Sequence, residues 1–595
     1  MYNFLKKNIF LVFIISVALM YLLFIGATPL FDRDEGYYVS VVMNMLNNHN
    51  YLLPIYNNEY WLEKPILLYW LIQTSTLLLG KSIFAFRLPA ACCGVLLILS
   101  MNFLLRKIIK DKTLSLIICA SIAFMPLLIV ISRTTMIDIP LVLSTTLTLL
   151  CFFIATERDK SCDRKWYYFS WFFLGLSFLA KGPVGVAIIL PAMFIYLLIQ
   201  RRFWHVFFRA NIPVGILIFC FVNFWYFIVF WKLGYKFWND FFIQQIFNRS
   251  SKSLVGGTAI FANLGGAFFY IATILLTTIP FIAPAVSGFL LALNKGLESR
   301  ESTWDKLALL SAVFSIITII IFSLSATKLP YYILPIYPFL GILVGYFWLN
   351  VKTSNNFFIP YKSVFWTISY LSSLLIIVVS FVAPFAIYFG WDSISNAVSQ
   401  DFNPTEYALP ATLPNYLWIL FLLGIVSILV IFLFKYFYRR KNINFMILTT
   451  IIGGFLYSLL AILIFFISIS WLQTPAINMA TELKSKLTKN SVVSELAIMK
   501  PSLHYYLNTD KINDYAFATE YAKSNKAQGI ENYTIINNLN ELDAKVSNKY
   551  PHYLITRDGL DIDYKSKNIS VIKNLHPYII LGNDKAKQQW KNHNF

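Results

Sequence analysis

The sequence predicts an α-helical protein that crosses a membrane many times and ends in a small soluble α/β domain. Composition is the first reason, because 58% of the 595 residues are hydrophobic, 13% are charged, and the mean hydropathy is +0.63. A water-soluble protein could not cover that much apolar surface, so lipid must be the main solvent. The second reason is that apolar runs of about 20 residues, the length that spans a bilayer, recur up to residue 469. The third is that charged residues become regular from about residue 473.

The formal net charge of +20 indicates that the basic residues face a membrane surface. We do not expect nucleic acid as a partner. In membrane proteins Lys and Arg crowd the cytoplasmic loops, where they face the anionic headgroups of membrane lipids. The six cysteines indicate no disulfide framework. Five of them lie in apolar runs, and Cys162 lies in a short basic loop that we place in the cytoplasm.

The first apolar run, residues 9–25, follows Lys6 and Lys7 and resembles a signal peptide in outline. It is long and lacks a clear small-x-small cleavage site, so we expect an uncleaved first spanning helix. The two lysines then place the N-terminus in the cytoplasm.

The basic clusters orient the remaining runs, since Lys and Arg stay on the cytoplasmic side of a membrane. We expect about 13 spanning helices, an odd number that places the two termini on opposite sides. The apolar run 66–79 is about 15 residues long, which is short for a span, and we expect it to lie flat in the interface. The expected spans are residues 9–25, 84–105, 114–132, 139–155, 166–179, 184–199, 212–231, 268–293, 307–325, 331–349, 364–389, 417–434 and 445–469.

A change in composition divides the chain into a membrane part, residues 1–472, and a soluble α/β domain, residues 473–595. Short β-rich runs at 492–493 and 553–555 alternate there with a helical stretch at 539–546. This domain holds four of the six histidines, and because they share no metal-ligand spacing we expect ordinary surface residues. The four are His504, His552, His576 and His593.

Two acidic positions on the outer side are candidates for chemistry. Asp34 and Glu35 begin the first outer loop, where residues 38, 41, 42 and 45 follow at helical spacing, so the acids lie at the start of an amphipathic helix on the membrane. Asp138 ends the run from Arg133, between two spans. The alternative for each acid is a helix cap that offsets the helix dipole and has no catalytic role.

Several outer cations lie near the ends of spans and suggest a basic rim that faces a lipid phosphate. Lys64 ends the first outer loop, and its alternative role is to snorkel at the interface. The others are Arg87, Lys181, Arg249 and Lys328.

Five features in order resemble one family: the pair Asp34-Glu35, Glu63-Lys64-Pro65, the approach from Gly80 to Arg87, Ala180-Lys181-Gly182, and residues 328–335, Lys-Leu-Pro-Tyr-Tyr-Ile-Leu-Pro. Together they look like the ArnT-type lipid A glycosyltransferases of the GT-C fold, to which protein O-mannosyltransferases also belong. The resemblance covers residues 1 to 470, and its strength comes from the order of the motifs and their placement on one face. It implies 13 spans, a flat pair of juxtamembrane helices and a periplasmic C-terminal domain.

The resemblance also implies an inverting transfer of an aminosugar from undecaprenyl phosphate to a lipid A phosphate at the bacterial inner membrane, the chemistry of polymyxin resistance. By the same resemblance Asp34, Asp138 and Glu35 are catalytic, Lys64 contacts the carrier phosphate, and Tyr332 lines the cavity. Arg249 resembles a family arginine, although Gln245 stands where many relatives have a histidine. No cofactor is firmly implied, a divalent cation beside Asp34 stays open, and a monomer is expected.

The chemistry of a polyprenyl phosphosugar sets what the site must supply. The phosphate leaves as a monoester whose second pKa is about 6, so no general acid is needed. Positive charge is needed instead, from Lys64 with Arg249, Lys181 and Arg87. A lipid A phosphate acceptor is already ionised, whereas a Ser or Thr hydroxyl would need Asp34 as its base.

Two alternatives stay open at this point: a protein O-mannosyltransferase that uses polyprenyl phosphate mannose, and a lipid or solute transporter. A transporter should carry ionisable residues near the middle of its spans, whereas here they cluster at the outer ends. The sugar is not determined either: aminoarabinose, galactosamine and a neutral hexose all remain possible, since selectivity comes from the shape of the cavity.

Overall fold

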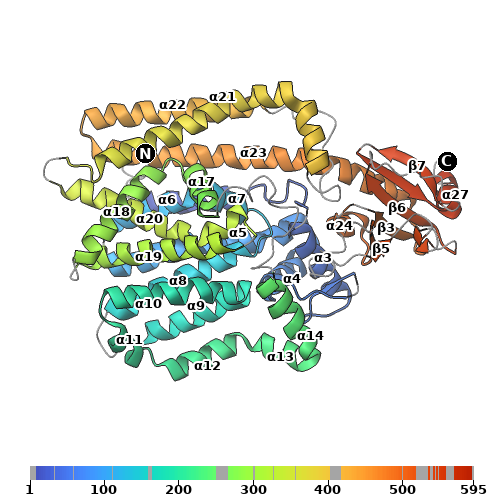
Figure 1. Ribbon diagram of the computed structural model, residues 1–595, viewed down its shortest axis with the longest axis horizontal. Helices are drawn as coiled ribbons and strands as arrows, with labels where there is room; N and C mark the ends of the chain where they lie inside the picture. The colour runs from blue at the N-terminus through green and yellow to red at the C-terminus, as the bar shows by residue number, and fades with distance from the viewer. Residues whose placement is uncertain are drawn as a thin grey trace.

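Apolar helices lie side by side along the longest axis of the molecule in a computed structural model of the chain, with a small sheet at one end (Figure 1). This arrangement confirms the predicted fold class, an α-helical polytopic protein with a small C-terminal α/β region. The structure describes residues 9–32, 34–57, 59–109, 111–157, 164–248, 266–298, 302–325, 327–354, 357–401, 417–496, 498, 500–517, 534–536, 541–542, 545–546, 549–557, 569–575 and 577–592.

Seven helices in the described ranges are long and apolar enough to cross a membrane. They are α5 (Ile83–Ile109), α8 (Asp138–Glu157), α19 (Thr303–Leu324), the 3-10 helix η3 (Pro330–Ile336) continued by α20 (Tyr337–Thr353), α21 (Lys362–Asp401), α22 (Trp418–Arg439) and α23 (Ile443–Lys486). Two bent pairs raise the number to nine if each pair is one span. The pairs are α6 (Lys112–Ala123) with α7 (Pro126–Ser132), bent by 67°, and α11 (Phe203–Arg209) with α12 (Ile212–Val222), bent by 64°.

Other expected spans are shorter or interrupted. The predicted span 212–231 breaks at Asn223 into α12 and α13 (Phe224–Leu233). The predicted span 268–293 breaks near Pro280, which has no N–H for the helical ladder, into α17 (Gly266–Thr277) and α18 (Ile282–Glu298). Three more apolar helices of 14 or 17 residues are α2 (Ile9–Leu22), α9 (Lys165–Lys181) and α10 (Pro183–Ile199). The count of 13 spans therefore stays a prediction.

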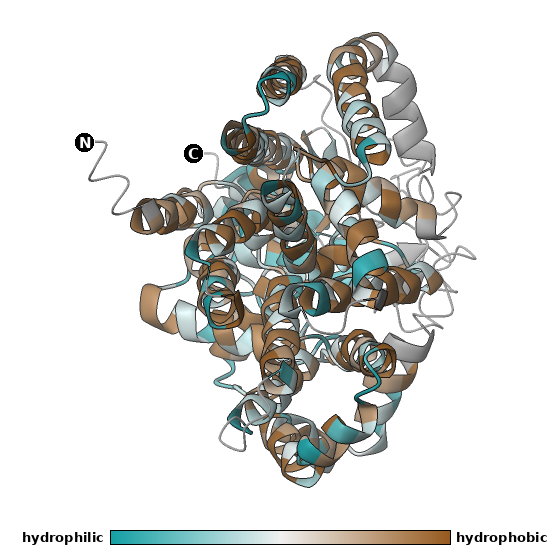
Figure 2. Cartoon of the chain, turned by 90° about the vertical axis from the view of Figure 1, so that its left-hand side faces the viewer, coloured by the Kyte–Doolittle hydropathy of each residue, from teal (hydrophilic) through white to brown (hydrophobic). Residues whose placement is uncertain are grey.

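The outward faces of the bundle are apolar, as a lipid solvent requires. Figure 2 shows brown along the helices and teal mainly at the turns that join them. Large side chains such as Phe221, Trp231 and Phe389 are more than four-fifths exposed, at 82%, 85% and 81%. Side chains of this kind on a water-facing surface would favour aggregation, whereas in a bilayer they contact acyl chains.

Between the bundle and the sheet lie α3 (Asp34–Asn47), a hairpin of β1 (Ile55–Tyr56) and β2 (Glu59–Tyr60), and α4 (Leu67–Leu79) (Figure 1). A helix does follow Asp34, as predicted, and α4 with 13 residues is too short to span a bilayer. The expectation that the helix after Asp34 lies on the membrane stays a prediction. Nearly all its residues from Glu35 to Leu46 are buried, and the elements that pack against it include β1, α4 and, from the C-terminal domain, α24.

The C-terminal region folds around a six-stranded mixed sheet of order β5-β4-β3-β6-β8-β7. Its strands are β3 (Val492–Leu496), β4 (Asn513–Phe517), β5 (Thr534–Ile536), β6 (His552–Arg557), β7 (Ser570–Leu575) and β8 (Tyr578–Gly582), with helices α24 (Leu503–Leu507) and α27 (Asp584–Asn592). The pairs among β5, β4, β3 and β6 are parallel, and β8 pairs antiparallel with both β6 and β7.

The predicted boundary at residues 472 and 473 falls inside α23, which runs unbroken from the bundle into the C-terminal region (Figure 1). Met479 and Leu483 of its last turns pack in one apolar core with Tyr553, Tyr578 and Trp590. Because one end of α23 packs in the bundle and the other in the C-terminal region, this continuous helix joins the bundle and that region rigidly.

The expectation of surface histidines was wrong for the two that the structure describes. His504 and His552 are 4% and 2% exposed, and burial lowers the pKa of each to about 4. Both are therefore neutral at neutral pH and belong to the domain core. His576 and His593 lie outside the described residues.

Candidate active site

The two candidate acids come together although more than a hundred residues separate them in the chain. Asp34 is the first residue of α3, and Asp138 is the first residue of α8. The carboxylate of Asp138 lies within electrostatic range of both Asp34 and Lys64. The structure therefore brings these three predicted residues to one site.

The carboxylate of Asp34 accepts a hydrogen bond from a different element of the site. The hydroxyl of Tyr331, on η3, donates a hydrogen bond of 2.6 Å to Oδ2 of Asp34. Sequence reasoning missed Tyr331, although it belongs to the run 328–335 that supplied Tyr332. A cap uses its oxygens on its own helix, so this bond to another element favours a role for Asp34 within the site.

Asp138 forms an ion pair with Lys181. The Nζ of Lys181 lies 2.5 Å from Oδ1 of Asp138, whose side chain is 2% exposed. The same ammonium lies 4.2 Å from the ring centroid of Tyr332, close enough for a cation–π contact. Lys181 thus joins the acid at the start of α8 to the aromatic pair on η3.

A sharp corner between two helices places Lys181. Lys181 ends α9, Gly182 caps that helix with φ at +67°, and Pro183 begins α10. Glycine adopts that φ without strain, and proline suits the first position of a helix. A Cβ on Gly182 would also lie 3.2 Å from the ring of Phe241, so a larger residue would be strained and crowded.

A cavity of about 530 Å³ opens beside these residues, within the usual size of ligand sites. Lys64, Lys181 and Tyr332 line it together with Glu63 and Thr327. The rest of its wall is mainly apolar and includes Val184, Ala187, Phe241, Ile321, Phe322 and Leu324. The cavity therefore combines two ammonium groups with a hydrocarbon surface, which suits a ligand with an anionic head and an apolar tail.

Glu35 and Arg87 form a buried ion pair and do not line this cavity. Arg87 is 1% exposed, and its Nε and Nη2 bind the two carboxylate oxygens of Glu35 at 2.8 and 2.6 Å. Its guanidinium also donates to the carbonyls of Ile25, Thr28 and Pro29. We therefore assign Arg87 to holding the first loop, and no described face of it is left for a phosphate.

The Glu35 carboxylate accepts two further bonds, from the backbone N–H groups of Phe31 and Thr135 at 2.8 and 2.6 Å. Burial alone would raise the pKa of Glu35, but the charge of Arg87 and these donors hold it below its ordinary value. Glu35 is thus a buried carboxylate that ties the first loop to the segment before Asp138, and it is not placed to exchange protons with a substrate.

Comparison with known proteins finds relatives of this chain. The sequence model of the dolichyl-phosphate-mannose-protein mannosyltransferase family matches residues 63–230. An uncharacterized protein of Aquifex aeolicus is 32% identical over 347 residues, which are 58% of this chain and 73% of that protein. An undecaprenyl phosphate-alpha-4-amino-4-deoxy-L-arabinose arabinosyl transferase of Erwinia tasmaniensis is 24% identical over 352 residues, which are 58% of this chain and 60% of that enzyme.

The crystal structure of ArnT from Cupriavidus metallidurans bound to undecaprenyl phosphate shares the fold, with a TM-score of 0.72. The two chains are 18% identical, and the match covers 97% of this chain and 98% of that one. This chain belongs to the ArnT-type family of membrane glycosyltransferases. The family predicted from the motifs is thereby confirmed, and so is the expectation of a glycosyltransferase.

Two further predicted cations of this ArnT-type chain are Lys328 and Arg249. Lys328 donates from Nζ to the carbonyl of Ser325 at 2.8 Å, and Ser325 itself lines the cavity, so Lys328 lies near its edge. Arg249 and the side chain of Gln245 fall outside the described part of the chain.

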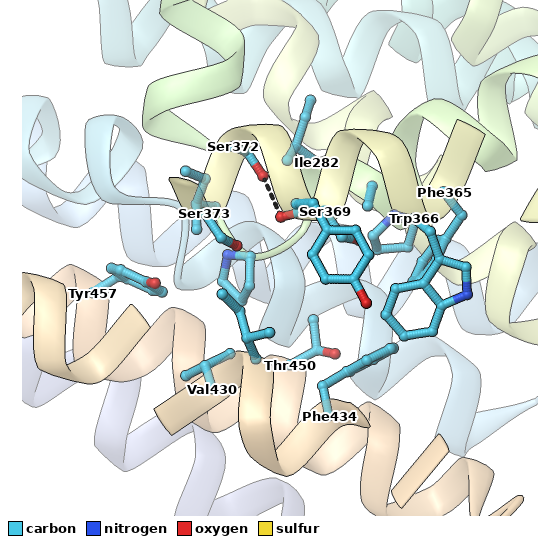
Figure 3. A pocket seen from close by; sticks show the side chains of 16 residues that line it. Ile282, Phe365, Trp366, Ser369, Ser372, Ser373, Val430, Phe434, Thr450 and Tyr457 are labelled. Atoms are coloured by element: carbon cyan, nitrogen blue, oxygen red, sulfur yellow. Dashed lines mark hydrogen bonds between the residues drawn. The ribbon is translucent and has the colours of Figure 1, made fainter. Parts of the chain in front are cut away.

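A second pocket, of about 50 Å³, lies between α18, α21, α22 and α23 (Figure 3). Aromatic and hydroxyl side chains such as Trp366, Tyr370 and Tyr457 line it, and Ser372 turns its hydroxyl back to the carbonyl of Ser369. It shares no lining residue with the larger cavity and has no Asp, Glu, Lys, Arg or His among the described residues around it. A space of this size holds no sugar, so we place the chemistry at the larger cavity.

A divalent cation beside Asp34 stays a prediction. Nowhere in the described ranges do three His, Cys, Asp or Glu side chains gather closely enough to hold a metal ion. Asp138, which lies within electrostatic range of Asp34, binds the Lys181 ammonium.

Proposed function

We propose that this ArnT-type chain transfers a sugar from a polyprenyl phosphate carrier to a phosphate of lipid A, at the outer face of the bacterial inner membrane. The observation that carries the proposal is the cavity in which Lys64 and Lys181 meet an apolar wall beside Asp34 and Asp138. In this proposal the protein acts as a monomer, with its N-terminus in the cytoplasm and its C-terminal domain in the periplasm.

A polyprenyl phosphosugar fits the two halves of that cavity. Its phosphodiester carries one negative charge, which suits the ammonium groups of Lys64 and Lys181, and its isoprenoid chain suits the apolar side chains of α10 and α19. The solved relative of the same fold was crystallised with undecaprenyl phosphate, which supports the same class of carrier here.

The transfer is a single displacement at C1 of the sugar. An oxygen of the acceptor phosphate forms the new bond to C1 while the bond from C1 to the carrier oxygen breaks, and the electron pair of that bond leaves with the carrier phosphate. Because the carrier changes from a diester monoanion to a monoester, negative charge grows on its phosphate as the bond breaks. We assign the stabilisation of that charge to Lys64 and Lys181, which line the cavity, a contribution worth about 10² or more in rate.

The acceptor phosphate is already ionised and gives up no proton, so this reaction does not need Asp34 to act as a base. We assign Asp34 to orienting the sugar or the acceptor through its carboxylate, which Tyr331 holds in place. The names of relatives such as the one from Erwinia tasmaniensis favour an aminoarabinose-like sugar as the group transferred.

Protein O-mannosylation is the second candidate, because the matching family model is that of protein mannosyltransferases and spans Lys64, Arg87, Asp138 and Lys181. A Ser or Thr hydroxyl is a weak nucleophile, so in that reaction Asp34 would accept its proton as the bond to C1 forms. The two candidates therefore share a donor and differ in the acceptor and in the role of Asp34.

Mass spectrometry of lipid A and of membrane proteins separates these candidates. Cells that carry the gene, cells without it and cells with Asp34→Asn are compared after labelling of the sugar pool. The proposal expects a sugar-sized mass gain on lipid A only with the wild-type gene. A gain on protein and not on lipid A would establish the second candidate, and the absence of covalent transfer would overturn both and favour a transporter.

A further inference from the structure

The C-terminal domain binds the segment that leads into Asp34 at the start of α3. Asp32, two residues before Asp34, forms an ion pair with Lys500, with Oδ2 and Nζ 3.1 Å apart. Both side chains are deeply buried, at 3% and 5% exposure. Oδ1 of the same carboxylate accepts the backbone N–H of Ser502 at 3.1 Å, so the acid is held at both oxygens by the C-terminal domain.

The contacts continue on both sides of Asp34. Before it, the backbone N–H of Leu30 donates to the hydroxyl of Tyr506 at 2.9 Å. After it, the hydroxyl of Ser40 donates to the carbonyl of Pro501 at 2.7 Å. Gly36 lies so close to α24 that a Cβ on it would be 2.8 Å from the nitrogen of Ser502. The segment around Asp34 is thus bound to residues 500–506 at four points.

The long helix α23 closes the remaining side of Asp32. With its amide oriented to suit the carboxylate, Gln473 donates to Oδ2 of Asp32 at 2.7 Å and accepts the Asp32 N–H at 3.2 Å. Burial alone would lower the pKa of Lys500, but Tyr578 and Asp32 beside the ammonium raise it. Lys500 is therefore charged, and Asp32 is enclosed by groups that all belong to α23 or to the domain beyond it.

A buried ion pair adds little net stability, since desolvation offsets most of the attraction, but it specifies one geometry. From these contacts we infer that the C-terminal domain is a clamp on residues 30–36, and that Asp32 and Lys500 are positioning residues for the transfer. They hold Asp34 against Tyr331, the neighbour of the cavity-lining Tyr332, without touching substrate. This inference rests on the proposed function for its kinetic consequences, because a shift of about 1 Å at a reacting group costs about 10² in rate.

The test uses Lys500→Met and, in case the single variant folds poorly, the double variant Asp32→Asn with Lys500→Met, which removes both charges of the ion pair. The full-length protein is assayed in detergent with a polyprenyl phosphosugar and lipid A. We expect kcat to fall about 10²-fold, KM for the donor to stay within about 2-fold, and backbone hydrogen exchange at residues 30–36 to rise. Lys545→Met is the matched control, because its ion pair with Glu541 lies exposed in the same domain.

A cross-link tests whether the fall in kcat comes from displacement of α3 relative to the C-terminal domain or from another effect of the substitution. Asn47 of α3 and Asp510 of the C-terminal domain are exposed, and their side chains hydrogen-bond at 2.6 Å. Cysteines at both positions, joined by a short bifunctional thiol reagent in the Lys500→Met background, should recover much of kcat. The reagent should have no effect on Lys500→Met without them.

The inference is overturned if kcat or hydrogen exchange at residues 30–36 is unchanged in the variants, or if a formed cross-link leaves kcat low. Should wild-type protein transfer no sugar at all, the proposed function fails, whereas hydrogen exchange still decides whether the clamp exists.

Discussion

Lys181, the last residue of α9, binds Asp138, the first residue of α8, because these consecutive helices pack as an antiparallel pair. The end of the second helix thereby meets the start of the first. An acid at a helix N-terminus and a base at a C-terminus are each favoured by the helix dipole, so the pair is stable in this orientation. The same ammonium reaches the cavity, so one residue serves both the helix pair and the substrate site.

We predict that Lys181→Met reduces kcat/KM about 10²-fold and lowers stability by about 3–5 kcal/mol, because it removes a phosphate contact and leaves Asp138 buried without a partner. Thermal unfolding and transfer assays measure the two effects separately. Adding Asp138→Asn should restore most of the stability and none of the rate. Lys165→Met, an exposed change at the opposite end of α9, is the control, and an equal effect there would contradict the prediction.

Asp34→Asn should lower transfer at least about 10²-fold without changing the melting temperature by more than a few degrees, because the amide keeps the shape and loses the charge. Tyr331→Phe removes the hydroxyl that donates to Asp34 and should lower kcat about 10-fold, the loss of one hydrogen bond of about 1.5 kcal/mol. Transfer measured at saturating donor tests both. Near-normal transfer with Asp34→Asn would return Asp34 to a capping role.

The sequence predicted the convergence of Asp34, Asp138, Lys64 and Lys181 because each lies next to an apolar run whose ends must reach the same membrane surface. That argument places residues at a level in the membrane and does not give their partners. Arg87 shows the difference. A cation at the end of a span has the same signature whether it faces lipid phosphate or, as here, is buried against Glu35.

Contacts between segments far apart in the chain could not be predicted from the hydropathy pattern, for another reason. Asp32 and Lys500 are 468 positions apart, and hydropathy periodicity reports only the environment of neighbouring residues. Nothing in the sequence around Asp32 indicates that the C-terminal domain covers it. For the same reason the packing of α24 of that domain against α3 was not predicted.

Lys64→Ala should raise KM for the polyprenyl donor about 10-fold or more and change kcat less, if its ammonium binds the carrier phosphate before the bond to C1 breaks. Lys64 lies 3.9 Å from Glu63, so Glu63→Gln should lower KM slightly by removing a competing charge. Initial rates over a range of donor concentrations distinguish the cases. Lys81→Ala is the control, since Lys81 binds Asn47 outside the cavity. An unchanged KM would show that Lys64 only snorkels.

The Glu35–Arg87 pair predicts a pH dependence of stability. The pKa of Glu35 is lowered in the folded protein from its ordinary value of 4.5, so its ionised form stabilises the fold above that pH and the contribution is lost as pH falls through the lower, folded value. Glu35→Gln leaves Arg87 charged and buried, and we expect it to cost about 3–5 kcal/mol at neutral pH. Melting temperatures of wild type and variant, measured from pH 8 downward, should differ by a constant amount to about pH 4.5 and converge below it.

Glu541→Gln, which alters an exposed ion pair, should show little difference at any pH. A gap between Glu35→Gln and wild type that persisted unchanged under acid conditions would mean that the variant acts by packing, since protonation of Glu35 removes its charge just as the amide does.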